Sequence, residues 1–166
     1  MSRKLKLTGG IIGVAAAALL ATSLPEKEGM ILTTYPDIVG KPTVCAGHTG
    51  EFAIAGKTYT TSQCWDILDK DVAKHAVPVI KCSAWILNTN PYFIQAAIDH
   101  AFQFGPNKWC TSEAKKYGQV GDYKKMCLLF SQTLTGGVNW SQAGGKYSRG
   151  VHNRSKWRTE TCRKGL

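Results

Sequence analysis

Charged residues, and acidic ones above all, are scarce in this sequence of 166 residues. Only 19% of its residues are charged, fewer than the ~25% that is typical of soluble proteins. The apolar fraction of 43% nevertheless excludes wholesale disorder and is sufficient for a hydrophobic core. The 17 glycines and 6 prolines are too few and too irregularly spaced for a collagen-like or low-complexity chain. Only one stretch is long and uncharged, so a protein with several membrane spans is also excluded.

The sequence also lacks any recognised nucleic-acid-binding motif, although its net charge is +10. The 21 basic residues are spread along the chain, and three of them (Arg3, Lys4 and Lys6) precede the apolar stretch. The rest of the excess suits an anionic cell envelope as partner, and no nucleic acid is expected. Cys45 and His48 could begin a metal site, but no second pair follows at ligand spacing. We therefore expect neither a metal nor a cofactor.

The amino terminus has the features of a targeting segment. Residues 7–24 (LTGGIIGVAAAALLATSL) are uncharged and follow a positively charged start. As a helix they would span about 27 Å, slightly less than the ~30 Å hydrocarbon core of a bilayer. Two interpretations are open: a secretory signal cleaved near Ala21-Thr22-Ser23, or an uncleaved and weakly hydrophobic membrane anchor. Both bring the chain into a compartment where its even number of cysteines can form disulfides.

Beyond this segment the patterns predict a small β region followed by a larger helical region in one domain. Residues 25–60 are rich in Gly, Thr and Pro, which favours short strands and turns. Thr60 and Gln63 form a capping box that predicts the start of a helix, and Pro78 predicts its end or a kink near residue 77. Apolar residues at helical spacing predict further helices over 91–104, 121–134 and 151–163.

Residues 28–50 contain the candidate catalytic groups. Glu28 and Asp37 lie on either side of a short predicted strand, so their carboxyl groups can face one cleft. Glycoside hydrolysis needs such a pair. One carboxyl group stays protonated and donates to the leaving oxygen, whereas the other is ionised and acts on water or on the developing positive charge.

The spacing of these groups resembles the catalytic signature of phage-type lysozymes, glycoside hydrolase family 24. The signature is read from Glu28-Gly29, Asp37, Thr43 and Gly47-His48. Downstream matches keep the order of the family: GDYKKMC at 121–127, glycine pairs at 136–137 and 144–145, and Gly150 followed by Arg154 and Glu160. The resemblance covers residues 25–166. It implies a lysozyme-like α+β fold with a cleft between a small β lobe and a larger helical lobe, preceded by an N-terminal apolar anchor helix.

The resemblance also implies a role for each site residue. Glu28 matches the general acid, Asp37 the carboxylate that positions or activates the attacking water, and Thr43 the residue that holds this water. Arg154 matches an arginine that lies against the catalytic glutamate, and His48 matches a structural histidine. The implied protein is a monomeric phage endolysin that hydrolyses the β-1,4 bond between N-acetylmuramic acid and N-acetylglucosamine in peptidoglycan.

Within the family, the chain is most similar to the signal-arrest-release endolysins of lambdoid phages. These keep a Gly/Ala-rich amino-terminal segment, which favours an uncleaved anchor over residues 1–24 and a catalytic domain over 25–166. The expected location is the host inner membrane, with the enzyme tethered and inactive, and then the periplasm after release. Residues 1–24 contain no cysteine, so activation by refolding of residues 7–27 is expected rather than a switch of an anchor disulfide. The resemblance pairs Cys45 with Cys64 and Cys127 with Cys162, which leaves Cys82 with Cys110.

Two other functions remain open on the sequence. One is a cationic, disulfide-stapled envelope-binding or antibacterial protein with a non-catalytic lysozyme fold. The other is a lytic transglycosylase, which needs the glutamate but no second carboxylate. The intact set of Glu28, Asp37 and Thr43 argues against the first, and Asp37 argues against the second.

Overall fold

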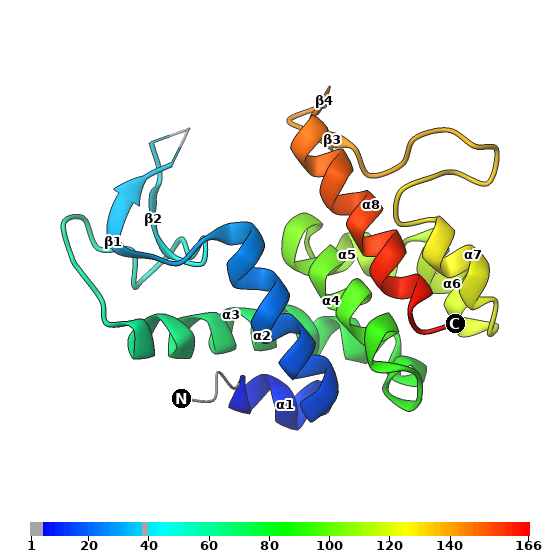
Figure 1. Cartoon of the computed structure of the whole chain (residues 1–166), viewed down its shortest axis with the longest axis horizontal. Helices are drawn as coiled ribbons and strands as arrows, with labels where there is room; N and C mark the ends of the chain where they lie inside the picture. Colours follow the sequence, from blue (N-terminus) through cyan, green and yellow to red (C-terminus); the bar gives the residue numbers. More distant parts are fainter. Residues whose placement is uncertain (1–4, 38–39) are drawn as a thin grey trace. The chain divides into compact units, whose positions relative to one another are not determined.

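The computed structural model describes residues 5–37 and 40–166, which form two compact units, residues 1–74 and 75–166 (Figure 1). Helices dominate both units within the described residues. The strands form two small antiparallel sheets, β1–β2 in the first unit and β3–β4 in the second. This mixture of many helices and small sheets agrees with the α+β class that the sequence predicts.

The amino-terminal segment differs from the single apolar helix expected over residues 7–24. It forms two helices, α1 (Lys6–Ile12) and α2 (Val14–Glu28), which are separated at Gly13. Gly13 has φ 85° and ψ 151°, a conformation that glycine adopts readily and that cannot continue a helix. Buried apolar side chains recur along α2, among them Ala17, Leu20 and Leu24. Within the described residues, no helix has the length and apolar character needed to cross a membrane.

Helix α1 is tied to helix α3 (Thr61–Cys82) by one carboxylate of the latter. Asp69 accepts hydrogen bonds from the backbone N–H of Leu7 (2.7 Å) and of Thr8 (2.9 Å). The Thr8 hydroxyl donates to the same carboxylate at 2.7 Å, and Thr8 is fully buried. Because the first N–H groups of a helix have no partner within the helix, a carboxylate from α3 satisfies them and anchors the start of α1.

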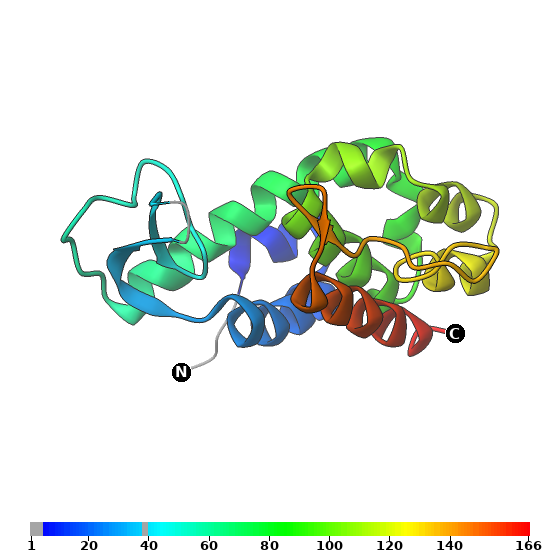
Figure 2. The same ribbon diagram turned by 90° about the horizontal axis from the view of Figure 1, so that it is seen from above.

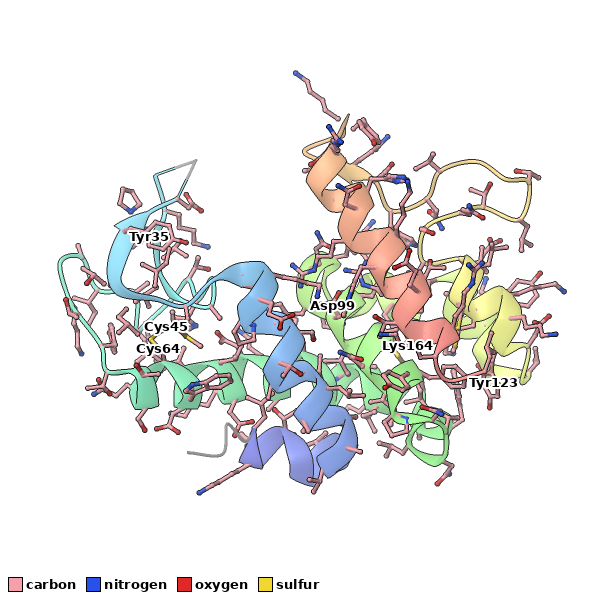
Figure 3. All side chains as sticks on the ribbon, in the orientation of Figure 1. Tyr35, Cys45, Cys64, Asp99, Tyr123 and Lys164 are labelled. Carbon is pink, nitrogen blue, oxygen red and sulfur yellow. A yellow bond between two sulfur atoms is a disulfide. The ribbon has the colours of Figure 1, made fainter. Side chains whose placement is uncertain are left out.

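The β region of the first unit is a short hairpin of β1 (Ile31–Pro36) and β2 (Pro42–Cys45). Ile31 lies opposite Cys45, and Tyr35 lies opposite Thr43. The disulfide Cys45–Cys64 joins the end of β2 to α3 (Figure 3). Around it lies a small apolar core that is formed by Val44, Ala53, Tyr59 and Ile67, with Met30, Leu32 and Phe52 packed against it.

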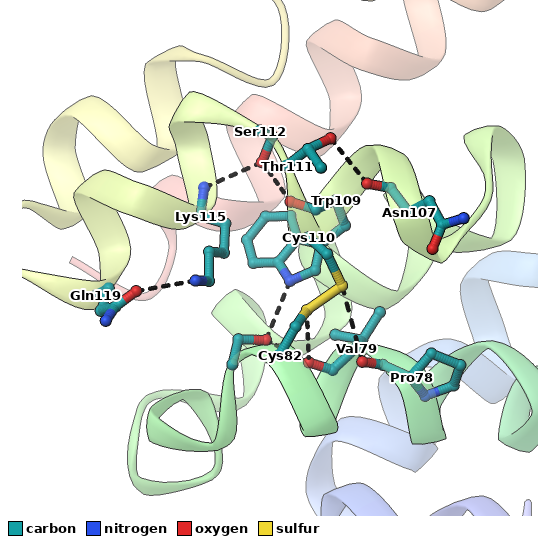
Figure 4. The surroundings of a disulfide bond; sticks show 11 residues. Pro78, Val79, Cys82, Asn107, Trp109, Cys110, Thr111, Ser112, Lys115 and Gln119 are labelled. Atoms are coloured by element: carbon teal, nitrogen blue, oxygen red, sulfur yellow. Dashed lines mark hydrogen bonds between the residues drawn. A yellow bond between two sulfur atoms is a disulfide. The ribbon is translucent and has the colours of Figure 1, made fainter.

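Helix α3 begins where the capping box predicts, but it extends beyond the end that Pro78 predicts. The Thr60 hydroxyl accepts from the Gln63 N–H at 3.2 Å, and the Gln63 amide oxygen accepts from the Thr60 N–H at 2.8 Å. Of the end or kink expected near residue 77, the end is wrong, because the helix passes through Pro78 to Cys82. Tertiary contacts stabilise this last turn. Cys82 forms a disulfide with Cys110, and the Ser83 hydroxyl donates to the Val79 carbonyl and accepts from the Trp109 ring N–H (Figure 4).

The second unit is built mainly of helices. Its elements after α3 are η1 (Ala84–Asn88), α4 (Pro91–Phe104), α5 (Pro106–Cys110), α6 (Glu113–Gln119), α7 (Tyr123–Leu128), β3 (Gln142–Ala143), β4 (Lys146–Tyr147) and α8 (Arg149–Arg163). Helix α4 matches the prediction, whereas α7 is shorter than the predicted 121–134, and α5 and α6 were not predicted. Helices α4 and α8 lie side by side in both views (Figures 1 and 2). The disulfide Cys127–Cys162 links α7 to α8, so all three bonds have the pairing that the resemblance implies.

A histidine lies in the aromatic core of this second unit. His100 is 1% exposed, and its ring makes an edge contact with Trp140 at 4.4 Å between ring centroids. Phe104 and Phe130 pack against the same ring at 5.0 and 5.8 Å. Neither ring nitrogen of His100 has a hydrogen-bond partner within the described residues. Burial and, to a smaller extent, the Arg158 guanidinium lower the pKa of His100 well below 6.5, so this histidine is neutral in the folded protein.

Candidate active site

The structure places Glu28 at the carboxyl end of α2, where the helix gives way to the β hairpin. Gly29 ends the helix with φ 78°, and its N–H donates to the Pro25 carbonyl at 3.0 Å. The Glu28 side chain is half-buried and lies against the turn that follows β2. A Cβ atom on Gly47 would stand 3.4 Å from Glu28 Oε2. The backbone of this turn can therefore lie close to the carboxyl group because residue 47 is a glycine.

Asp37 follows β1 directly and belongs to the loop that closes the hairpin. Its backbone N–H donates to the Lys41 carbonyl at 2.9 Å, and its Oδ1 accepts from the Lys41 N–H at 2.8 Å. Residues 38 and 39 lie outside the described residues. These two bonds hold the carboxyl group of Asp37 at a fixed place at the end of the strand, and its half-buried position leaves it accessible to water.

Thr43 lies in β2, and its side chain is buried at 4% exposure. Its hydroxyl donates to the Lys41 carbonyl at 3.0 Å. A hydroxyl that donates one hydrogen bond keeps oxygen lone pairs that can accept another, for example from a water molecule. Asp37 and Thr43 are both bonded to Lys41, so the same loop backbone positions the two side chains.

His48 is part of the turn beside Glu28 and is held on two sides. The backbones of Val44 and His48 exchange hydrogen bonds of 2.9 and 2.8 Å, which close the turn. Nδ1 of His48 lies 2.7 Å from Oδ2 of Asp71 on α3. Cys45 adopts a left-handed conformation within this turn, with φ 58°, and its disulfide to Cys64 adds a second link to α3. These contacts fix the His48 ring and its turn against α3, and the structural role that the resemblance implies stays a prediction.

Arg154 belongs to the second unit, on α8, and its guanidinium group contacts Asp99 of α4. Arg154 Nη2 donates to Asp99 Oδ1 at 3.0 Å, and Arg154 Nε lies 3.4 Å from Asp99 Oδ2. Arg158, one turn further along α8, donates to the same carboxylate. Burial alone would raise the pKa of Asp99, but the guanidinium groups of Arg158 and Arg154 hold it below its usual value. Asp99 is therefore ionised at neutral pH.

The sequence analysis missed Asp99, although a signal was present. It is the only acidic residue in the predicted apolar helix 91–104, and a lone carboxylate on such a helix is either exposed or paired. Glu28, Asp37, Thr43 and His48 belong to the first unit, and Arg154 belongs to the second. The contact of Arg154 with Glu28 and the cleft between two lobes stay predictions. Among the residues described, no three side chains of His, Cys, Asp or Glu gather as metal ligands would.

A pocket of about 550 Å³ opens on the second unit, between α5 and the segment that leads to β3. Phe104 and Trp140 provide aromatic surfaces, Asn139 and Gln142 provide amides, and Lys108 provides a positive charge. Aromatic rings with amides at their edge can bind sugar rings, because the C–H faces pack on the aromatic rings and the hydroxyl groups bond to the amides.

The many helices, the small hairpin and the carboxyl pair beside it define a protein with a lysozyme-like fold. Comparison with solved structures agrees: the active form of the P1 phage endolysin Lyz superposes with a TM-score of 0.74 over 96% of this chain and 93% of that one, at 19% identity. An endolysin from the Escherichia coli O157:H7 phage FAHEc1 gives 0.70 over 87% of this chain and 90% of that one, at 20% identity.

Sequence comparison assigns the family. Residues 25–158 match the phage lysozyme family, so the chain belongs to it. Two relatives are proteins named SAR-endolysin, from Enterobacteria phage PA-2 and Enterobacteria phage P21, and each is 32% identical. The matched regions span 93% of this chain and 88% of each relative.

Proposed function

We propose that this protein is a phage endolysin that hydrolyses the β-1,4 bonds between N-acetylmuramic acid and N-acetylglucosamine in peptidoglycan and thereby lyses the host. The observation that carries the proposal is the arrangement of Glu28, Asp37 and Thr43. Glu28 ends a helix beside a glycine turn, and the other two side chains are fixed on the adjacent hairpin through Lys41. The similarity to SAR-endolysins over most of the chain supports the same function.

In the proposed reaction, Glu28 donates a proton to the glycosidic oxygen as the bond between this oxygen and the anomeric carbon breaks. A water molecule held by Asp37 and Thr43 adds to the anomeric carbon, and its proton passes to the Asp37 carboxylate. The Thr43 hydroxyl already donates to the Lys41 carbonyl, so its oxygen accepts from this water. The products are two shorter glycan chains, one of which carries a new reducing end.

The other site residues are proposed to keep this pair in place. Arg154 lies against Glu28 in the proposed active enzyme and supplies a positive charge beside the carboxyl group. His48 holds the turn that contacts Glu28, because its ring is bonded to Asp71 on α3. The pocket around Phe104 and Trp140 is proposed to bind part of the glycan chain, and the net charge of +10 attracts the anionic cell wall.

We also propose that residues 1–24 anchor the chain in the host inner membrane before release into the periplasm. The names of the relatives support this. In the folded structure, Leu20 and Leu24 are fully buried. The apolar face that lipid would cover in the tethered state is thus covered by protein in the folded state. A segment of such weak hydrophobicity can exchange one environment for the other at low cost.

The first experiment measures the clearing of purified peptidoglycan by the full chain, by Glu28→Gln and by the control Glu26→Gln. Glu26 is exposed, lies two residues earlier in α2 and loses the same charge on substitution. We expect the wild type and Glu26→Gln to clear the suspension and Glu28→Gln to remain inactive. If Glu28→Gln clears as well as the wild type, Glu28 is not the acid.

The products separate hydrolysis from the alternative reactions. Hydrolysis yields reducing ends, a lytic transglycosylase yields anhydro ends, and a binding protein yields neither. Anhydro ends would refute the assignment as a hydrolase. The anchor is tested separately by the intact mass of the chain from membrane and periplasmic fractions: an uncleaved anchor predicts the full mass in both, and loss of the first 20 to 24 residues would refute it.

A further inference from the structure

The second unit contains a buried ion cluster that the proposed chemistry does not use directly. Asp99 is 0% exposed, and its neighbours on α4, such as Ala97, Ile98 and Ala101, are buried and apolar. Burial of an ionised carboxylate is strongly unfavourable unless partners compensate it. Apolar side chains of similar size would make this core equally stable or more stable, so stability alone does not account for the cluster.

Arg158 holds one oxygen of the Asp99 carboxylate. Arg158 is fully buried and binds Asp99 Oδ2 with Nε at 2.8 Å and with Nη2 at 2.7 Å. The same Nη2 donates to Gln103 Oε1 at 2.7 Å, which fixes Arg158 to α4 a second time. Arg158 therefore determines how the plane of the Asp99 carboxylate is oriented.

The other oxygen of Asp99 is directed to Arg154. Asp99 Oδ1 accepts from Arg154 Nη2 at 3.0 Å, and the Arg154 Nε lies 3.4 Å from Oδ2. The Arg154 side chain is 13% exposed, whereas those of Asp99 and Arg158 are fully buried. The contacts thus run from the buried Arg158, through the carboxylate of Asp99 on α4, to the partly exposed Arg154.

We propose that Asp99 is a positioning residue that holds the Arg154 guanidinium in the orientation in which it acts on Glu28. This inference rests on the proposed function, in which Arg154 lies against Glu28. An unrestrained arginine side chain populates many rotamers, and its contact with both oxygens of Asp99 restricts it to one orientation before substrate binds. The cluster combines one carboxylate with two guanidinium groups.

The test compares steady-state kinetics of the full chain with those of Asp99→Asn on soluble glycan fragments. Asparagine has nearly the same shape, but it carries no charge and has only one acceptor oxygen. We expect kcat to fall about 10- to 100-fold with KM within about twofold, as for other small misplacements of an active-site group. In spectra of the arginine side chains, the Arg154 Nε–H signal should shift and broaden in Asp99→Asn.

A matched control separates positioning from loss of stability. Thr159 lies on α8 beside Arg158, and its buried hydroxyl is bonded to Ser131 at 2.9 Å. Thr159→Val should lower the melting temperature and keep the wild-type kcat at a temperature well below melting. If Asp99→Asn loses only stability, as Thr159→Val does, Asp99 is merely structural and the proposal is wrong.

A second variant covers the case in which Asp99→Asn does not fold. Gln103→Met keeps Asp99 and removes only the Gln103 Oε1 atom that accepts from Arg158 Nη2. The proposal expects a smaller fall in kcat, about two- to fivefold, with the same broadening of the Arg154 signal. An unchanged kcat and signal in this folded variant would overturn it.

Glu28→Gln in the same assay separates this inference from the proposed function. If Glu28→Gln remains active, the proposed acid is wrong, and the inference about Asp99 fails with it. If Glu28→Gln is inactive while Asp99→Asn keeps its kcat, the proposed function stands and only the positioning role is wrong.

Discussion

Asp69 should decide whether the amino-terminal helix stays attached to the folded protein. Its carboxylate accepts three hydrogen bonds from the start of α1, at 2.7, 2.9 and 2.7 Å. In Asp69→Ala the N–H groups of Leu7 and Thr8 and the buried Thr8 hydroxyl lose this acceptor. The backbone contact between the Thr8 hydroxyl and the carbonyl of residue 69 is retained.

The expected magnitude follows from these contacts. Loss of a helix N-cap costs about 1 kcal/mol, and a hydrogen bond to a charged group contributes about 1.5–3 kcal/mol. Leu7 is exposed, which reduces its share, so we expect about 2–3 kcal/mol in total. For a chain of this length that corresponds to a melting temperature lower by about 5–10 °C if α1 unfolds with the rest.

Hydrogen exchange and thermal unfolding together test this reasoning. The Thr8 amide should exchange faster by one to two orders of magnitude, whether α1 detaches alone or unfolds with the whole protein, since about 1.4 kcal/mol corresponds to a factor of ten. The control is Asp66→Ala, which removes an exposed acidic residue three positions earlier on α3. Unchanged protection of the Thr8 amide in Asp69→Ala, or an equal loss in Asp66→Ala, would refute the role of the carboxylate.

Two further substitutions test the site and the aromatic core. Gly47→Ala and Gly56→Ala both place a side chain at positive φ, 78° and 74°, so each should cost about 1–2 kcal/mol of stability. Only Gly47→Ala adds an atom beside Glu28 Oε2, so we expect peptidoglycan clearing to slow about tenfold in this variant alone, and equal rates in both would contradict the contact. Burial lowers the pKa of His100 well below 6.5, so below pH 6.5 the unfolded chain binds a proton that the folded one does not. The free energy of unfolding should therefore fall by up to about 1.4 kcal/mol per pH unit below that pH. Urea unfolding of His100→Met from pH 7 to 5 should show a smaller change of the unfolding free energy with pH than the wild type shows. An unchanged pH dependence would show that His100 does not cause it.

Local signals in the sequence predicted the elements whose ends depend on neighbouring residues. Thr60 and Gln63 predicted the start of α3, and the helix predicted over 91–104 begins at Pro91, where the Asn90 side chain accepts from the Tyr92 N–H. These signals act within one helical turn, so no other part of the chain is needed to satisfy them. The spacing of Glu28, Asp37 and Thr43 was likewise sufficient to identify the family.

The same local rules failed where distant contacts prevail. Pro78 was expected to end or kink α3, and an end there is wrong, because the disulfide from Cys82 to Cys110 and the contacts of Ser83 stabilise the turn beyond it. The apolar segment 7–24 was expected to form one helix, whereas the structure breaks it at Gly13. Helix α1 then meets a carboxylate 61 residues away in the sequence.

The sequence by itself thus determined the family, the local helix starts and the residues that carry the proposed chemistry, because each depends on residue type and short spacing. Only the tertiary structure revealed that Asp99 binds two arginines of α8 and that Asp69 holds the start of α1. Asp69 belongs to no sequence motif, and the sequence marks Asp99 only as the single acidic residue of an apolar helix, without indicating its partners. What they contact is decided by which helices pack together, and a buried or half-buried carboxylate must then find its partners among the side chains and N–H groups that this packing brings near.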